Sequence, residues 1–254
     1  MKCMLAVYIF LLACGIASAQ QAEVKNEGTR PNYRELVKGL VSPNRPIKCD
    51  SLSLNRTISI PPNYDWNAQR RIEKNRQILF DHCEEALPSL IEGCTDSRYS
   101  LVSKWSEDDD FYVWSVGRVC LEILSRHVEA FRHEMRFPDP HRWHQYNFVP
   151  IPNGPMSEAK KKTMQEWWRQ RKGMSLRELQ LEAFDWAIEK RKQEPKRGPH
   201  PQNKRNSDDE LNRLVSARDK LRQGHKPLPD GVMWVSLLSP PEGYTLVPWT
   251  EKGE

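Results

Sequence analysis

Residues 116–131 read Val-Gly-Arg-Val-Cys-Leu-Glu-Ile-Leu-Ser-Arg-His-Val-Glu-Ala-Phe, and this stretch decides the fold class. Side chains suited to burial recur in it at helical spacing and form one broad stripe: Val116, Val119, Cys120, Ile123, Leu124, His127 and Phe131. A stripe of this width predicts a helix that packs against several neighbours.

Two further helices are predicted before this stretch, within Tyr64–Met135. The first begins near Trp66 and places four side chains on one face: Ile72, Leu79, Phe80 and Cys83. The second carries Leu87, Leu90, Ile91 and Cys94, with Pro88 in its opening turn, where proline is tolerated. We expect the three helices to hide each other's apolar sides.

Part of this region resembles a HEAT repeat. The residues that carry the resemblance are Leu87-Pro88-Ser89-Leu90-Ile91-Glu92, Asp96-Ser97-Arg98 and Val116–Leu124. They are similar to the proline-leucine, aspartate and small-residue helix pattern of that family, over one unit of roughly 65 residues. Residues 100–114 stand as an insertion where the family has a tight turn. Together with the apolar N-terminal residues 1–19, the tryptophan-rich helices and Leu179–Ala183, these features make the whole chain resemble uncharacterised secreted bacterial proteins.

The second half of the chain predicts a helical hairpin. Ser157 starts one helix, which Gly173 closes, and Ser175 with Glu178 forms a capping box for the next helix, which ends before Pro195. A second capping box at Ser207–Glu210 predicts a last helix that ends at Gly224. Two β-prone runs, 232–238 and 244–249, flank a Pro-Gly turn and predict a β-hairpin. This hairpin could pair with an extended piece at 52–60.

The sequence therefore predicts a mainly α fold with a HEAT-like helical core, a following helical hairpin and a small C-terminal β-hairpin. The expected organisation is a signal peptide at 1–19, an N-terminal extension with a short helix and a strand at 20–62, a helical HEAT-like domain at 63–189, a basic proline-rich linker at 190–206, and a C-terminal helix and β-hairpin at 207–254.

The first 19 residues predict export. An uncharged apolar run follows Met1-Lys2 and ends in Ala17-Ser18-Ala19, which is typical of a signal-peptide cleavage site. The mature chain would begin at Gln20 and be secreted or periplasmic. Leu11–Gly15 also resembles a lipobox, so a lipoprotein anchored through an acylated Cys14 is an alternative. The run is too short for a transmembrane helix, which needs about 20 residues.

Export changes the interpretation of the cysteines. Four remain in the mature chain as disulfide candidates: Cys49, Cys83, Cys94 and Cys120. Cys83 and Cys94 cannot pair with each other if they share one helical stretch, because 11 residues of helix separate them by about 16 Å. Cys120 would then pair with one of them and Cys49 with the other. The alternative is that the three helical cysteines are buried free thiols.

Charge and histidine clusters suggest two further sites. His133, His141 and His144, with Asp139 nearby, form the local group that could hold a metal, although loop histidines also pack beside Trp143 and Tyr146. The basic region 160–205, with Trp167 and Trp168 interleaved, suggests contact with a polyanion. Its glutamates dilute that charge, and the mature net charge is only +4, since the leader removes Lys2 from a total of +5. The acidic run Glu107–Asp110 favours a solvated tip over a calcium loop.

Taken together, these patterns favour an exported, non-catalytic binding or scaffolding protein, with protein as a plausible partner. The chain has no glycine-rich phosphate loop, no nucleophile elbow and no nucleic-acid motif. No catalytic residue or cofactor is assigned, and nucleic acid is not the expected partner. The alternatives are a metal-dependent hydrolase that uses His133, His141 and His144, and a polyanion-binding module that uses 160–205.

Overall fold

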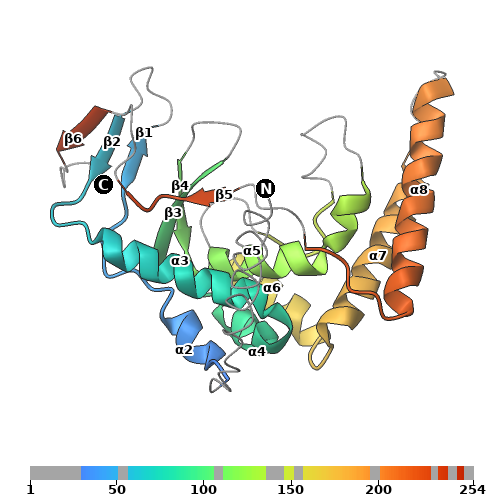
Figure 1. Cartoon of the computed structure of the whole chain (residues 1–254), viewed down its shortest axis with the longest axis horizontal. Helices are drawn as coiled ribbons and strands as arrows, with labels where there is room; N and C mark the ends of the chain where they lie inside the picture. The colour runs from blue at the N-terminus through green and yellow to red at the C-terminus, as the bar shows by residue number, and fades with distance from the viewer. Residues whose placement is uncertain are drawn as a thin grey trace, which may run out of the picture. The chain divides into compact units, whose positions relative to one another are not determined.

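The part of the chain that the computed structural model describes is mainly helical, as the sequence predicts (Figure 1). It comprises residues 30–50, 57–105, 111–135, 146–151, 157–194, 201–229, 234–239 and 245–248. The helices are α2 (Tyr33–Lys38), α3 (Trp66–Asp81), α4 (Cys83–Gly93), α5 (Val116–Val128), the 3-10 helix η1 (Ala130–Glu134), α6 (Glu158–Gln170), α7 (Leu176–Gln193) and α8 (Pro201–Arg222). The strands are β1 (Lys48–Asp50), β2 (Thr57–Ile60), β3 (Tyr99–Trp105), β4 (Phe111–Ser115), β5 (Trp234–Ser236) and β6 (Thr245–Pro248).

The strands form two three-stranded sheets. In the first, β2 lies between β1 and β6, antiparallel to β1 and parallel to β6. In the second, β3 lies between β4 and β5 and is antiparallel to both. Strands β3 and β4 pair within the predicted insertion between α4 and α5, to which the sequence assigns no secondary structure beyond an acidic loop at 107–110. The HEAT-like interpretation of the two helices stays a prediction.

The predicted C-terminal β-hairpin is wrong. The two runs do form strands, but β5 pairs with β3 and β6 pairs with β2, so the strands belong to different sheets (Figure 1). The physical reason is that β2 and β3 each offer an edge whose backbone groups need partners. Pairing of the C-terminal run with the 52–60 region is confirmed for Thr57–Ile60.

Helix α5 is the centre of the core. Every residue from Val119 to Arg126 is buried, and the helix contacts α3, α4, α7, β3 and β4. Two glycines let α4 and α5 approach closely. A Cβ on Gly93 would lie 2.7 Å from Cys120 Sγ, and a Cβ on Gly117 would lie 2.4 Å from the Cys94 carbonyl oxygen.

One hydrophobic cluster joins elements that the sequence analysis assigns to separate regions. It contains Val37 and Leu40 near α2, the buried faces of α3 to α7, and Leu214 and Leu221 of α8. Residues from Tyr33 onward accordingly group into one compact unit. Among the described helices, none combines the length and the apolar character that crossing a bilayer requires.

The predicted start of the last helix is also wrong. Helix α8 begins at Pro201, so Ser207 lies within the helix and not at its start. Glu210, expected to complete the capping box, is buried and paired with Arg191 of α7 instead. The predicted linker at 190–206 is helical at both ends, since α7 runs to Gln193. The other capping box is confirmed: Glu178 N donates to Ser175 Oγ, and Ser175 N donates to Glu178 Oε2.

Candidate functional site

Charged side chains gather between α3 and α5, in what we call the interior charge cluster: Glu73, Arg76, Arg118, Glu122 and Arg126. Arg76 donates Nε and Nη2 to the two Glu73 oxygens (2.8 and 2.7 Å) and Nη1 to Glu122 Oε2 (3.2 Å). Arg126 Nε donates to Glu122 Oε1 at 2.7 Å. Because buried charge is costly unless it is paired, this arrangement is compatible with a folded interior.

The electrostatics of the cluster follow from burial and pairing. Burial lowers the pKa of Arg76, but its hydrogen bonds and ion pairs with Glu73 and Glu122 outweigh burial, and the net pKa is raised. For Arg118 burial dominates and the pKa is lowered, against a smaller opposite effect of Glu122. Both guanidiniums remain charged at neutral pH, because their ordinary pKa lies above about 12.

Strand β5 is attached to this cluster through Ser236. Its hydroxyl donates to Glu73 Oε2 at 2.6 Å. A serine held by a carboxylate suggests a nucleophile and its base. Here, however, Arg76 donates hydrogen bonds to both Glu73 oxygens. The contact therefore joins β5 to α3.

A fully buried carboxylate fixes the segment at 146–151. Glu129 Oε1 accepts hydrogen bonds from the backbone N–H groups of Phe148 (2.6 Å) and Val149 (2.8 Å). Its other oxygen lies 2.6 Å from Arg132 Nη2, which also donates to the Tyr146 carbonyl oxygen. The Glu129 carboxylate therefore holds the segment at 146–151 against the end of α5.

An aromatic surface with two stacked cations lies beside that segment. Arg171 stacks on Trp167, with its guanidinium carbon 3.9 Å from the ring centroid. Lys190 Nζ lies 5.0 Å from the Tyr146 ring and 4.8 Å from the Trp186 ring. Lys190 is partly buried, and this burial lowers its pKa against a smaller opposite effect of Glu194. The tryptophans therefore pack against helices and against the protein's own cations.

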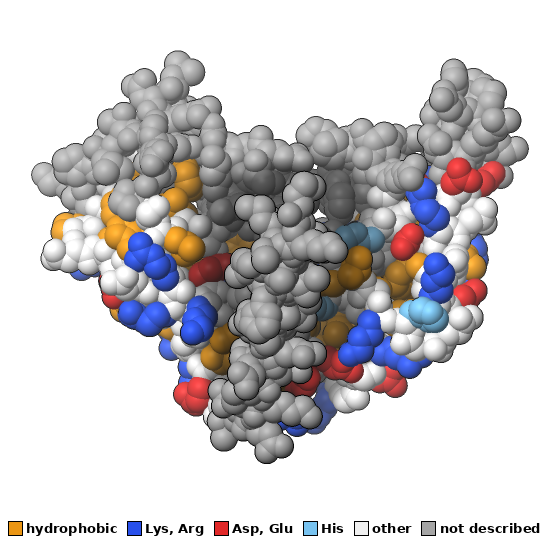
Figure 2. Space-filling view, viewed as in Figure 1, with side chains coloured by type: hydrophobic (Ala, Val, Ile, Leu, Met, Phe, Trp, Pro, Cys, Tyr) orange, Lys and Arg blue, Asp and Glu red, His pale blue; other side chains and the backbone are white. Residues whose placement is uncertain are grey.

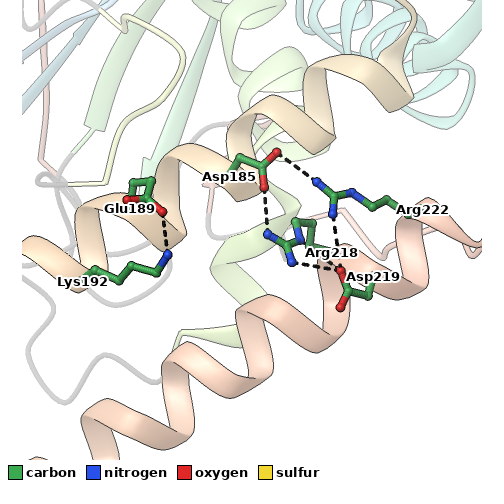
Figure 3. Close-up of polar contacts among 6 residues, drawn as sticks. All are labelled: Asp185, Glu189, Lys192, Arg218, Asp219 and Arg222. Atoms are coloured by element: carbon green, nitrogen blue, oxygen red, sulfur yellow. Dashed lines mark hydrogen bonds and ion pairs between the residues drawn. The ribbon is translucent and has the colours of Figure 1, made fainter.

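Ion pairs also join α7 to α8 (Figure 3). Arg218 contacts Asp185 (3.1 Å) and Asp219 (3.0 Å), and Arg222 contacts the same two carboxylates more loosely, at 3.4 and 3.8 Å. Asp185 and Asp219 are about half exposed. A second link, from Arg191 to Glu210 at 2.9 Å, is buried at both ends. Helix pairing thus uses one exposed and one buried set of charges.

The predicted disulfide candidates are three buried thiols and one residue without a described side chain. Cys83, Cys94 and Cys120 are free and buried. Burial raises the pKa of all three thiols, to about 12 for Cys120. A high pKa suppresses the reactive thiolate. The predicted pairing of Cys120 with Cys83 or Cys94 is therefore not present, and the alternative of buried free thiols holds for these three. The Cys49 side chain lies outside the described part of the structure.

The histidine group that was predicted to hold a metal lies only partly within the described residues. His133 is exposed, and its Nε2 lies 2.5 Å from the Pro229 carbonyl oxygen. His141, His144 and Asp139 lie outside the described residues, as does the acidic run at 107–110. Within the described ranges, no three His, Cys, Asp or Glu side chains are arranged to hold a metal ion.

The predicted polyanion surface is partly neutralised. On α6, Lys161 pairs with Glu158 and Arg169 with Glu166, each at 2.7 Å. On α7, Lys192 pairs with Glu189 at the same distance. Residues 195–200 lie outside the description. Because neighbouring glutamates occupy these cations, the described part of 160–205 presents a mixed surface.

A cleft lies at the corner between β2 and α3, and we call it the corner cleft. It encloses about 330 Å³ and is lined by residues 43–45 and 61–64, which are Pro-Asn-Arg and Pro-Pro-Asn-Tyr. Figure 2 shows hydrophobic side chains gathered near this corner, over the start of α3.

Hydrogen bonds hold the walls of the corner cleft in place. The Asn44 side chain accepts from Asp65 N (2.7 Å) and donates to the Asp65 carbonyl oxygen (3.0 Å). The Tyr64 and Tyr99 hydroxyls are 2.5 Å apart. Asn63 adopts a left-handed backbone conformation, with φ 57°. Such a conformation is uncommon for a residue other than glycine and is a reason to look for a function.

Sequence reasoning missed both the interior charge cluster and the corner cleft. For the cluster a signal exists: Arg118, Glu122 and Arg126 recur every four residues within the apolar helix at 116–128. For the cleft, Pro61-Pro62-Asn63 indicates a turn, but nothing local shows that residues 43–45 face it. Comparison with known proteins gives no matching family model, no matching curated protein and no matching solved structure.

Proposed function

We propose that this is an exported, non-catalytic binding protein that presents rigid surfaces to a ligand or to a partner protein. The observation that carries the proposal is the corner cleft, whose two wall segments are fixed by hydrogen bonds before any ligand arrives. Pre-organised walls reduce the entropy that binding must overcome.

The chemistry of the described interior also favours binding over catalysis. Arginines hold the carboxylates of Glu73 and Glu122, and burial raises the pKa of the cysteine thiols. A cysteine nucleophile requires the opposite, a thiol whose pKa is lowered so that the thiolate forms. The two carboxylates join α3 to α5 through Arg76.

No described contact favours the two alternatives. The metal-dependent hydrolase would rest on His133, His141 and His144, of which only His133 is described, and this residue contacts a backbone carbonyl. The polyanion-binding module would rest on 160–205, where Lys161, Arg169 and Lys192 are already paired with glutamates.

Binding and catalysis can be separated by following the fate of a ligand. The purified chain would be screened by thermal shift against zinc chloride, heparin, an acidic oligosaccharide and a neutral oligosaccharide. Any compound that raises the melting temperature would then be incubated with the protein and analysed by mass spectrometry. We expect it to be recovered unchanged. Stoichiometric zinc in the purified protein together with a cleaved ligand would overturn the proposal.

Export is tested on the full-length chain. Expression in a bacterium, followed by fractionation and mass spectrometry of the N-terminus, should find a chain that begins at Gln20 outside the cytoplasm. A chain that begins at an acylated Cys14 would support the lipoprotein alternative. A cytosolic chain that keeps Met1–Ala19 would contradict export.

A further inference from the structure

We propose that Tyr64 and Tyr99 form an oxidative cross-link site, at which a peroxide-driven one-electron oxidant couples the two rings into a dityrosine. Their hydroxyl oxygens lie 2.5 Å apart, although the two residues are 35 positions apart in the sequence. The inference goes beyond the proposed binding function and does not depend on it.

The fold holds both rings in place before any oxidation. Tyr64 and Tyr99 pack against one small hydrophobic cluster, whose buried residues are Ile47, Ile58 and Val102. The Tyr64 ring also contacts the ring of Trp66, with 4.7 Å between the centroids. Groups that are already in contact lose little further freedom when they join, so a reaction between them is favoured over a reaction between separate molecules.

The backbone on each side of the pair is fixed as well. Asp65, the neighbour of Tyr64, donates its N–H to the Asn44 side chain at 2.7 Å. Tyr99 begins β3 and pairs with β4, and its carbonyl oxygen accepts from Ser42 N at 2.9 Å. Both attachment points are therefore held by hydrogen bonds, which keeps the two hydroxyls together.

The coupling reaction starts from the contact that the structure shows. Each hydroxyl loses one electron and its proton to give a phenoxyl radical. The two radicals join through the ring carbons next to the hydroxyls, and the hydrogens on these carbons move to the oxygens. The pair gives up two hydrogen atoms in all, and these reduce one hydrogen peroxide to two water molecules. In the product the two hydroxyls again lie side by side, next to the new carbon–carbon bond.

The pair is also within reach of an oxidant. Neither tyrosine is fully buried, and Tyr64 lines the corner cleft. Tyr146 provides a contrast, because it is fully buried and its hydroxyl donates to Glu194 Oε1 at 2.5 Å. The cross-link would join the cleft wall at 61–64 to the start of β3.

The test is oxidation of the dilute full-length protein with hydrogen peroxide and a haem peroxidase. We expect dityrosine fluorescence in a species that stays monomeric in size-exclusion chromatography, with a yield that does not change on dilution. Digestion with trypsin and mass spectrometry should recover the peptides 57–70 and 99–104 joined, with the loss of two hydrogens. A monomer without dityrosine, or one whose linkage joins other tyrosines instead, would overturn the proposal.

Matched variants locate the cross-link. Tyr64→Phe and Tyr99→Phe keep the ring and remove the hydroxyl, and each should lower the dityrosine fluorescence of the monomer by at least about tenfold. Tyr112→Phe removes a tyrosine of β4 that is 40% exposed, and it should leave this fluorescence unchanged. Equal fluorescence in the Tyr64 and Tyr112 variants would contradict the assignment. Circular dichroism would establish that each variant is folded.

Stability gives a second measurement. A covalent bond between residues 64 and 99 closes a long loop and restricts the unfolded chain, as a disulfide does. The oxidised natural protein should therefore melt several degrees above the untreated protein, whereas Tyr64→Phe should gain nothing from the same treatment. Equal gains in the two proteins would contradict a stabilising cross-link at this pair.

Discussion

At the scale of single residues, Gly117 has no room for a side chain. Its N–H donates to the Asp96 carbonyl oxygen at 2.8 Å, and an added Cβ would lie 2.4 Å from the Cys94 oxygen and 2.9 Å from the Asp96 oxygen. Both obstacles are backbone atoms, which cannot rotate away. The close approach of α5 to the end of α4 therefore requires glycine here.

We expect Gly117→Ala to lower the free energy of unfolding by about 2–3 kcal/mol, since over-packing of this kind forces a backbone shift. Urea denaturation followed by circular dichroism measures the change. Gly93→Ala is the matched comparison, because its added Cβ would meet a side chain, Cys120 Sγ, at 2.7 Å. Cys120→Ala should partly rescue Gly93→Ala and should not rescue Gly117→Ala. Rescue of both would contradict the backbone clash.

His127 gives the fold a dependence on pH. Burial lowers its pKa from 6.5 to about 4, against smaller opposing effects of a hydrogen bond with the Phe80 backbone and of Asp81. Its Nε2 is buried without a hydrogen-bond partner in the described structure, so a second ring proton would find no acceptor there. The neutral imidazole is therefore the form that the folded protein accommodates.

Because the folded pKa is depressed, the unfolded chain binds this proton first as the pH falls. Protonation of His127 should therefore lower the free energy of unfolding by about 1 kcal/mol per pH unit between pH 6.5 and pH 4. Below pH 4 this group should cause no further loss. Urea denaturation at pH 7 and at pH 5 should show a smaller loss for His127→Gln than for the natural protein. Equal losses of stability in the two proteins would mean that groups other than His127 cause the pH dependence.

At the scale of elements, the α7–α8 pair contrasts buried and exposed charges. Arg191 and Glu210 have side chains that are 10% and 5% exposed, whereas Asp185 and Asp219 are each 48% exposed. Removal of one partner from a buried pair leaves an uncompensated charge, while an exposed partner is solvated by water.

Accordingly, Arg191→Gln should destabilise the protein by about 3 kcal/mol and Arg218→Gln by less than about 1 kcal/mol. Chemical denaturation at low and at moderate salt would measure both. Only the Arg218 effect should shrink with added salt, because screening acts on exposed charges. Similar losses that respond alike to salt would contradict this difference in burial.

At the scale of the whole molecule, one large hydrophobic cluster joins α2 to α8, and a smaller one lies around Ile47, Ile58 and Val102. Val37 near the start of the described region and Leu221 near the end of α8 belong to the same cluster. Strands β5 and β6 add to sheets whose other strands lie about 120 residues or more earlier in the chain. Long-range contacts of this kind make separate unfolding of the C-terminal region costly.

Unfolding should therefore occur as one cooperative transition. Far-ultraviolet circular dichroism, which reports on helices, and tryptophan fluorescence, which reports on tertiary packing around residues such as Trp168, should give coincident curves. Two separated transitions would indicate that the region from 207 onward folds on its own, as the division by sequence suggests.

Local sequence patterns determined where most helices lie, although not the start of α8, because helix formation depends on apolar spacing and capping within a few residues. The stripe at 116–131 and the capping box at Ser175 and Glu178 are both present in the structure. Sequence patterns gave the wrong prediction where a residue contacts a partner distant in the sequence. Glu210 pairs with Arg191 and does not complete a cap, and β5 and β6 pair with β3 and β2 instead of with each other.

The interior charge cluster and the corner cleft also depend on residues distant in the sequence. Only tertiary packing brings Arg76 to Glu122, or residues 43–45 to residues 61–64, because charge pairing and cavity shape depend on distances in space that no local spacing encodes.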